Sequence, residues 1–252
     1  MCTLIIAWRV LADAPVVVAA NRDEATDRPS TPPAPWAGAP RIVAPRDERA
    51  GGTWIGYNEA GLFVGISNRW SDEQLPAGRS RGLLVADALG QESAESAAGV
   101  VEDALAADPY DGFNLVLADA DVAMLLQWGG RLDVTEFDPG VHVVMNAGFD
   151  EQFRAVEARR DAARHQAENA RSVRAALRPD PDEDAEAWLD RAGAVLGGHD
   201  FGVCVHGDGY GTRSSSLLAL YPDGTATFRY ADGPPCETPF ESVVRRPAEG
   251  QS

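Results

Sequence analysis

The sequence contains no lysine: all 22 of its basic residues are arginine, against 39 acidic residues. The resulting formal net charge of −17 argues against nucleic-acid binding, because contact with phosphates requires concentrated positive charge. The shortage of positive charge also disfavours binding to anionic membranes. A large acid excess is typical of salt-accumulating halophiles, whose acidic surfaces stay hydrated while salt screens their self-repulsion. A GC-rich genome would explain the missing lysine but not the excess of acid, so we favour the halophile.

Cysteine is also sparse, and the chain has three: Cys2, Cys204 and Cys236. An odd, small set is unsuited to a disulfide framework and indicates reduced thiols. No run approaches the roughly 18 apolar residues of a membrane span, and the start lacks the basic lead and long apolar core of a signal peptide. We therefore expect a cytoplasmic protein without stable membrane insertion. At 252 residues and 44% hydrophobic composition, the chain can bury the core of a single domain over residues 1–252.

Strand-like and helical stretches alternate in blocks. Short apolar, β-branched runs bounded by turn residues predict strands, and alanine-rich stretches predict helices. The expected strands are 3–10, 16–21, 52–57, 62–67, 113–119, 122–128, 141–146, 201–206, 212–220 and 224–230. The expected helices are 80–105, 151–177 and 182–196. The proline-rich stretch 28–40 should be an ordered extended loop, and the tail from about residue 234 should be irregular. This order indicates a layered α+β fold with helices outside stacked sheets.

The opening Met1-Cys2-Thr3 offers a candidate nucleophile. Cytosolic processing usually removes methionine ahead of a small residue, which would leave Cys2 with a free α-amine. An α-amine has an ordinary pKa of about 8 and a thiol one of about 8.5, so the amine can accept the thiol proton near neutral pH. No histidine is then needed. The alternative is a semi-buried strand cysteine that packs as a small hydrophobe.

Several motifs follow Cys2. They are Asn21-Arg22-Asp23-Glu24, Gly51-Gly52-Thr53-Trp54-Ile55-Gly56, Asn58-Glu59-Ala60-Gly61-Leu62, Gly65-Ile66-Ser67-Asn68-Arg69, Asn146-Ala147-Gly148 and Tyr210-Gly211-Thr212-Arg213-Ser214. Together they resemble the NRDE family, also called the transport and Golgi organisation protein 2 family. That family is similar to the choloylglycine hydrolase and penicillin V acylase group, which open with a cysteine and cut non-peptide amides. The resemblance implies a four-layer αββα sandwich of the N-terminal-nucleophile (Ntn) hydrolase type, with two stacked, mainly antiparallel sheets.

The resemblance also implies a catalytic site. Cys2 matches the nucleophile, and Asp23 matches the aspartate that orients the terminal amine and thiol through charge-assisted hydrogen bonds. Asn68 and Asn146 match positions that furnish donors to a tetrahedral oxyanion. Arg213 matches an arginine near the nucleophile, where its positive charge would lower the thiol pKa.

One departure from the acylases concerns Arg22. The acylases place an arginine three residues before the aspartate, and that position here is Ala20. Neighbouring strand residues face opposite sides, so Arg22 and Asp23 can point into one pocket only if the strand ends or bulges there. Arg22 is then a candidate substrate-binding residue. The alternative is a structural ion pair between Arg22 and Glu24 that holds the turn.

Tryptophans complete the candidate substrate-binding set. Most tryptophans are core residues, because aromatic area usually buries. Trp36 and Trp70 stand in expected loops beside the motifs, where they could wall a hydrophobic cleft, and we group Trp54 of the glycine-rich motif with them. The glycines of that motif lack the following lysine and helix start of a phosphate-binding loop, so we interpret them as sites of close strand packing.

Metal and haem ligands are weakly indicated. Cys204 and His206 lie two apart on an expected strand, and therefore on one face, which allows a metal pair. No further ligands cluster with them in the sequence, so we expect core or rim residues and no metal site. His142, His165 and His199 lack the Cys-x-x-Cys-His context of covalent haem attachment. We expect no required cofactor, and non-covalent haem stays open as a ligand.

Two functions remain open, together with a third hypothesis, a scaffold with a relic site, which gains support if Cys2 is buried under Met1. The first is an Ntn-type hydrolase of a small non-peptide amide, which requires a processed Cys2 and a donor-lined pocket at the sulfur. The second is a non-catalytic carrier, implied by the links of the resembling family to haem trafficking and to lipid or acyl-CoA homeostasis. A carrier requires a pocket dominated by apolar walls. Either function has a small molecule as its partner, and the sequence alone does not decide between them.

Overall fold

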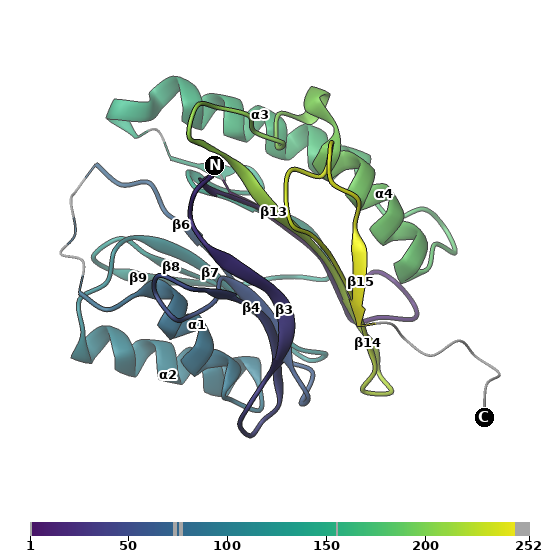
Figure 1. Cartoon of the computed structure of the whole chain (residues 1–252), viewed down its shortest axis with the longest axis horizontal. Helices are drawn as coiled ribbons and strands as arrows, with labels where there is room; N and C mark the ends of the chain where they lie inside the picture. Colours follow the sequence, from purple (N-terminus) through teal and green to yellow (C-terminus); the bar gives the residue numbers. More distant parts are fainter. Residues whose placement is uncertain (1, 73–74, 76–77, 155, 245–252) are drawn as a thin grey trace.

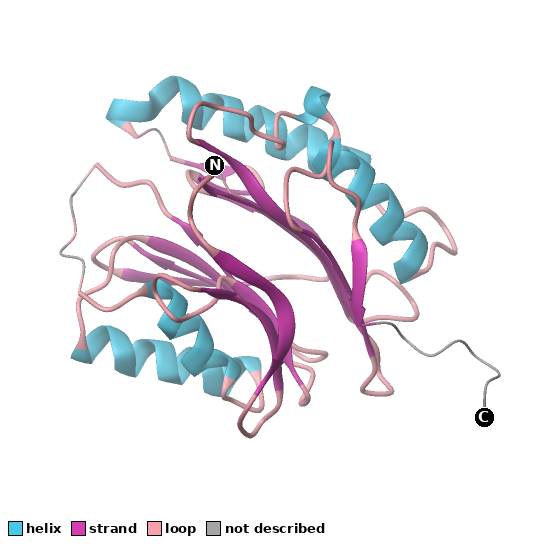
Figure 2. Cartoon of the chain, in the orientation of Figure 1, coloured by secondary structure: helices cyan, strands magenta, loops and turns pink. Residues whose placement is uncertain are grey.

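The computed structural model describes residues 2–72, 75, 78–154 and 156–244, which form two stacked antiparallel sheets (Figures 1 and 2). The eight-stranded sheet has the order β12 (Gln152–Phe153), β11 (Gly148–Phe149), β10 (Gly140–Met145), β1 (Thr3–Trp8), β2 (Val16–Ala25), β13 (Tyr210–Leu220), β14 (Ala226–Ala231) and β15 (Glu241–Val244). The seven-stranded sheet has the order β3 (Ser30–Trp36), β4 (Ile42–Asp47), β5 (Ile55–Asn58), β6 (Phe63–Asn68), β7 (Phe113–Ala118), β8 (Ala123–Trp128) and β9 (Leu132–Glu136).

Helices cover the outer face of each sheet. Figure 1 shows α1 (Arg81–Leu89) and α2 (Ala94–Ala107) below the seven-stranded sheet, and α3 (Arg160–Ala176) and α4 (Ala185–Gly197) above the other. Three apolar cores separate the four layers: one under each helix pair and one between the sheets. This arrangement confirms the predicted αββα sandwich. No helix among the described residues is long and apolar enough to span a membrane.

The alternation of side chains along β2 decides where its polar end points. Val16 and Val18 belong to the core between the sheets, whereas Val17 and Ala19 belong to the core under α3 and α4. Successive strand residues face opposite sides, so the residues that follow continue the same pattern. Both faces of β2 are buried here, which is why its apolar run is continuous rather than alternating.

The stretch 28–40, predicted as a loop, contains the edge strand β3. An edge strand needs backbone donors on one side only, so it tolerates prolines, and the register with β4 shifts between Thr31 and Ala34, where Pro32 and Pro33 lie. The predicted helix 80–105 is two helices, because Ser93 begins α2 with a capping box.

Other elements also differ from the sequence prediction, which included no strand at β4 or β9. The segment 201–206 is not a strand: a 3-10 turn, η2 (His199–Phe201), is followed by an irregular stretch up to β13. The tail predicted to be irregular contains β15, which pairs with β14. The helix predicted from residue 151 begins at Arg160, after β12 and the 3-10 turn η1 (Glu157–Arg159).

The acid excess predicts that salt stabilises this fold. A net charge of −17 repels itself in the folded state, and the screening length falls from ~10 Å at 0.1 M salt to ~3 Å at 1 M. We expect the thermal unfolding midpoint to rise steadily between about 0.1 and about 2 M KCl. Sucrose at matched osmolarity controls for general exclusion from the protein surface. A midpoint that rises no more in KCl than in sucrose would contradict a role for charge screening.

Candidate functional site

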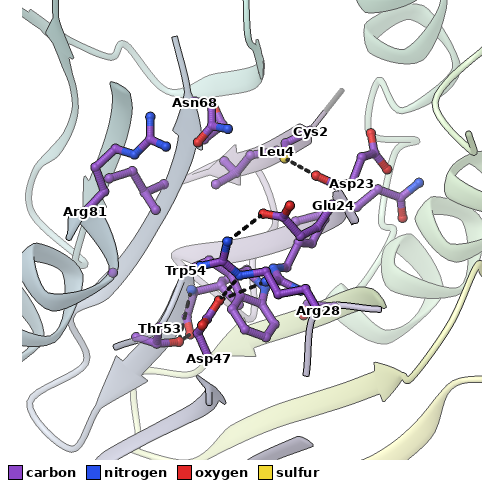
Figure 3. Close-up of a pocket in the computed structure, with 18 of the residues that line it drawn as sticks. Cys2, Leu4, Asp23, Glu24, Arg28, Asp47, Thr53, Trp54, Asn68 and Arg81 are labelled. Atoms are coloured by element: carbon purple, nitrogen blue, oxygen red, sulfur yellow. Dashed lines mark hydrogen bonds and ion pairs between the residues drawn. The ribbon is translucent and has the colours of Figure 1, made fainter. Parts of the chain in front are cut away.

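A cavity of about 140 Å³ lies between the two sheets, where β1 begins and where β4 and β6 end (Figure 3). Most of its lining residues are polar or charged. The predicted site residues in its wall are Cys2, Arg22, Asp23, Trp54 and Asn68. The start of the chain, the end of β2 and the glycine-rich motif therefore meet at one place.

Cys2 is partly buried and is held at both its nitrogen and its sulfur. The Cys2 backbone nitrogen donates to Asn146 Oδ1 at 3.0 Å. The thiol donates to the backbone carbonyl of Asp23 over a 3.5 Å separation, which Figure 3 shows as a dashed line. Burial, and then the negative charge of Asp23, raise the pKa of the Cys2 thiol to about 11. The thiol in this state is therefore protonated at neutral pH.

Asn146 connects Cys2 to both sheets. Its Oδ1 also accepts a hydrogen bond from Gln166 Nε2 at 3.2 Å, and its Nδ2 donates to the backbone carbonyl of Asn68 at 2.7 Å. Gln166 is fully buried on α3 and accepts from the backbone N–H of Ala147. The Asn146 side-chain amide already donates to the Asn68 carbonyl, so it is not available as a donor to a ligand in the cavity. Its role in this structure is to hold the Cys2 nitrogen.

Asn68, unlike Asn146, lines the cavity. It is the last residue of β6 and is exposed. Within the described parts of the chain, no group forms a hydrogen bond with the Asn68 carboxamide. Its Nδ2 is therefore a donor that a bound ligand can use.

Asp23 is buried and is fixed by β13. Asp23 faces Thr212 across the two strands, and the Thr212 hydroxyl donates to Asp23 Oδ1 at 2.6 Å. The register of β13 against β2 shifts between Thr212 and Ser214, so Arg213 is an extra residue there. β2 itself neither ends nor bulges at Arg22 and Asp23, because it continues to Ala25 and the extra residue lies in the partner strand β13.

Arg22 does not pair with Glu24, the partner considered from the sequence. Its Nη2 lies 3.1 Å from Asp47 Oδ2, and its guanidinium lies 4.1 Å from the centre of the Trp54 ring. Glu24 pairs instead with Arg28, which also binds Asp47 (Figure 3). The other terminal nitrogen of Arg22, Nη1, is buried without a hydrogen-bond partner within the described residues.

Three predicted site residues lie elsewhere. Arg213 forms an ion pair with Asp232 at 2.8 Å and does not line the cavity, so the arginine that lowers the thiol pKa is Arg22. Trp36 packs with the core under α1 and α2 and donates to a backbone carbonyl of β4. Trp70 stacks under Arg159, outside the cavity wall. A tryptophan beside a motif in the sequence need not share its pocket.

Sequence reasoning missed several contributors. Arg81 lines the cavity at the first turn of α1, and its Nη1 donates to the carbonyl of Gly112 at 2.7 Å. Asp47, Thr212 and Gln166 fix the side chains described above. Of these three residues, only Thr212 lies inside one of the motifs, so the sequence could have identified it as a site residue. The others come from stretches without a motif.

Asp23 and Asp47 should respond oppositely to replacement by asparagine. Burial raises the pKa of Asp23, so keeping it ionised costs stability once the pH exceeds the ordinary aspartate value of 3.8. Asp23→Asn should therefore gain stability over the parent as the pH rises from 3.8 towards neutrality. Burial opposes ionisation of Asp47 too, but hydrogen bonds from Arg28 and the Ala50 N–H outweigh it and lower its pKa.

Asp47 thus contributes stability above the unfolded pKa, and this contribution is lost as the pH falls through its lowered pKa. Asp47→Asn should lose stability at neutral pH and approach the parent in acid. Guanidinium unfolding of the parent and both variants between about pH 3 and about pH 7.5, a range that brackets aspartate titration, measures the two trends. Two variants with the same pH dependence would contradict the assignment.

The sequence matches the family described as Transport and Golgi organisation 2 over residues 1–230. A curated relative from Homo sapiens, "Transport and Golgi organization protein 2 homolog", is 26% identical over 234 residues, covering 84% of each chain. The relative of the same name from Bos taurus is 27% identical over 236 residues, again covering 84% of each. The family match therefore includes Cys2, the four described helices and every described strand up to β13, whereas β15 lies beyond it.

Solved structures of Ntn hydrolases share the fold. Penicillin V acylase from Agrobacterium tumefaciens superposes with a TM-score of 0.58 at 14% identity, covering 92% of this chain and 83% of that one. A mutant of conjugated bile acid hydrolase from Clostridium perfringens gives 0.59 at 10% identity, covering 97% and 92%. The N-acylethanolamine-hydrolyzing acid amidase orthologue of Caenorhabditis elegans gives 0.55 at 11%, covering 88% and 93%. These likenesses show the fold, and the family match shows that the chain belongs to the Transport and Golgi organisation 2 family.

Proposed function

We propose that this protein is an Ntn-type hydrolase of a small non-peptide amide, with Cys2 as its nucleophile once Met1 is removed. The observation that carries the proposal is the placement of Cys2 in the wall of a mainly polar cavity, with its nitrogen held by Asn146 and its sulfur by Asp23. The fold is that of amidases with N-terminal nucleophiles. The function rests on these residues, because a fold alone hosts many functions.

The chemistry requires a base for the thiol. With a pKa of about 11, only about one thiol in 10⁴ is ionised at pH 7. A free α-amine on Cys2, with an ordinary pKa of about 8, supplies that base within the same residue. The sulfur then attacks the amide carbon, its proton passes through the α-amine to the leaving amine, and a thioester forms. Water adds to the thioester and releases the acid, which restores the thiol.

Asn68 is the proposed oxyanion donor. Its amide faces the cavity without an internal partner among the described residues, so it can donate to the oxygen that becomes negative during attack. Asn146 holds the nucleophile by accepting from the Cys2 nitrogen, and Asp23 lies beside it. This assignment separates the two asparagines, which the family resemblance treats alike.

The size and polarity of the cavity favour hydrolysis over haem carriage. Its volume of about 140 Å³ is below the ~300 Å³ at which pockets for drug-sized ligands begin. An amide with a short acyl group fits that space. Arg22 Nη1 has no acceptor within the described chain, so a carboxylate on the substrate would complete its hydrogen bonds.

The test compares a chain that begins at Cys2, released from a tag by a protease, with the Met1-bearing chain. Both are incubated with short N-acyl amides offered as pairs, one with a free carboxylate and one as its methyl ester. The proposal expects turnover and an acyl adduct on Cys2, detected by intact mass, for the Cys2-initiated chain alone. It also expects a preference for the carboxylate. Absence of both turnover and adduct in the Cys2-initiated chain would overturn the proposal.

The carrier alternative has its own measurement. Haem is titrated into the same two preparations in high salt, and absorption is followed. A saturable spectral shift of equal size in both preparations, without amide turnover in either, would favour a non-catalytic haem carrier over a hydrolase. The cavity volume leads us to expect no saturable shift.

A further inference from the structure

Four nitrogen- and sulfur-bearing side chains gather at a second place in the molecule. They are His199, Cys204, His206 and Cys236, and none of them lines the cavity at Cys2. Their candidate ligand atoms all lie within 4.8 Å of one another. Cys204 is buried, and the other three are exposed, so the cluster lies at the surface with one side closed by protein.

The separations fit a tetrahedral metal site. Zinc–sulfur bonds of about 2.3 Å and zinc–nitrogen bonds of about 2.0 Å place two thiolates about 3.8 Å apart and a thiolate and an imidazole about 3.5 Å apart. Cys204 Sγ lies 3.5 Å from Cys236 Sγ and 3.6 Å from His206 Nε2, and His206 Nε2 lies 3.1 Å from Cys236 Sγ. The rings of His199 and His206 meet edge to face, with centres 5.3 Å apart.

Hydrogen bonds of the surrounding backbone hold the segment 199–206 in place. Asn21, buried on β2, donates from Nδ2 to the carbonyl of Val203 at 2.9 Å. Val205, between Cys204 and His206, donates to the Thr212 hydroxyl and accepts from the Thr212 N–H. The segment that carries three of the ligands is therefore fastened to both β2 and β13 without a metal.

The fourth ligand arrives from the loop between β14 and β15. Gly197, the last residue of α4, lies so close to this loop that an added Cβ would lie 3.2 Å from the Pro235 carbonyl group and 3.3 Å from the Cys236 nitrogen. The end of α4 leads directly into His199. Close packing of one glycine thus brings two segments, 37 residues apart at His199 and Cys236, to the same point.

We propose that His199, Cys204, His206 and Cys236 bind one zinc ion in a tetrahedral site of two nitrogens and two sulfurs. Thiolate and imidazole ligands together select zinc over the hard cations, which prefer oxygen. Binding displaces the two thiol protons to solvent, and no change of oxidation state is involved. Four protein ligands fill the coordination sphere, so the ion has a structural role rather than a catalytic one.

The site is linked to Asp23 by a short path. Thr212, which is bonded to Val205, also donates to Asp23 Oδ1 at 2.6 Å. An ion that fixes Cys204 and His206 therefore fixes Thr212, and with it the buried carboxylate beside Cys2. Zinc would stabilise the folded chain by binding it in preference to the unfolded chain.

The experiment titrates Co(II), as a spectroscopic substitute for zinc, into the full chain kept reduced with a phosphine. We expect one Co(II) per chain with the intense visible bands of a tetrahedral site and a thiolate charge-transfer band, displaced by one equivalent of zinc. Native mass spectrometry should show one zinc per chain. Cys204→Ser, Cys236→Ser and His206→Gln should each lose the tetrahedral spectrum, whereas Cys2→Ser and the exposed His165→Gln should keep it.

Three results would overturn the proposal. One is a reduced, folded parent without a tetrahedral cobalt spectrum. Another is a spectrum that survives Cys236→Ser, which would place the ion elsewhere. The last is a disulfide between Cys204 and Cys236 that persists in excess reductant. His206 is exposed, so His206→Gln should fold like the parent, which circular dichroism checks. This variant keeps the test valid even if the cysteine variants fail to fold. None of these measurements depends on amide hydrolysis.

Discussion

Replacing Gly52 with alanine should destabilise the protein by about 3 kcal/mol, at the upper end of overpacking effects. A Cβ at this position would lie 2.1 Å from the carbonyl carbon of Gly82, 2.3 Å from its oxygen and 2.5 Å from the Leu83 nitrogen. All three are backbone atoms at the start of α1, so no side chain can move aside. The backbones are also joined directly, because the Thr53 N–H donates to the Gly82 carbonyl at 3.0 Å.

The same contact sets one wall of the cavity. Arg81 precedes Gly82, and the Gly52 carbonyl accepts from the Asp47 N–H at 2.8 Å, so a displaced Gly52 would move both Arg81 and Asp47. Urea unfolding measures the loss. The matched control is Gly99→Ala in α2, where an added Cβ meets nothing within 4 Å and should raise stability by about 1 kcal/mol. If Gly52→Ala had the same unfolding midpoint as the parent, α1 would not lie as close to Gly52 as the structure shows.

The sequence predicted the layered fold well because most of its strands are buried on at least one face. The run from Val16 to Ala20 is apolar for this reason, and the strands β7 and β8 are mostly apolar too. Most exceptions were edge elements, although the interior strand β4 was missed as well. β3 is rich in proline, β9 is short and only partly buried, and β15 is short and largely exposed, so none of them carries a clear apolar signal. Such strands are specified by pairing with the neighbouring strand rather than by their own residues.

The candidate site shows a similar division. Motifs located Cys2, Asp23 and Asn68 at one cavity, but a motif does not fix the direction of each side chain. Arg213 follows Thr212 in the same motif and is the extra residue at the register shift, and its side chain pairs with Asp232 instead of approaching the thiol.

Contributors from the helices could not be found by pattern. Gln166 lies in a stretch of alanine, arginine and glutamate that predicts a solvated helix, yet it is fully buried and bonded to Asn146. The expectation of no metal site depended on Cys204 and His206 having no neighbours with ligand atoms. The fold turns the nearby His199 towards them and supplies Cys236 from 32 residues beyond Cys204, and only the approach of α4 to the β14–β15 loop reveals the cluster.

Replacing Cys2 with alanine should reduce kcat for amide hydrolysis by at least about 10³-fold, because no other described group at the cavity can form the thioester. The acyl adduct seen by intact mass should disappear with the activity. The Cys2 side chain is only partly buried and belongs to none of the three apolar cores, so the thermal midpoint should change little. Activity that survives Cys2→Ala would remove this residue from the mechanism.

Asn68→Ala gives the graded comparison for the same assay. Removal of one oxyanion donor typically costs about 10²- to 10³-fold in kcat, roughly 2.7–4 kcal/mol of transition-state stabilisation, with the nucleophile intact. The acyl adduct should therefore still form, but slowly. Because the Asn68 carboxamide has no partner within the described chain, its loss should leave stability unchanged, whereas Asn146→Ala should lower both stability and rate by breaking three hydrogen bonds. If the two asparagine variants lost activity and stability in parallel, the division of roles between them would be wrong.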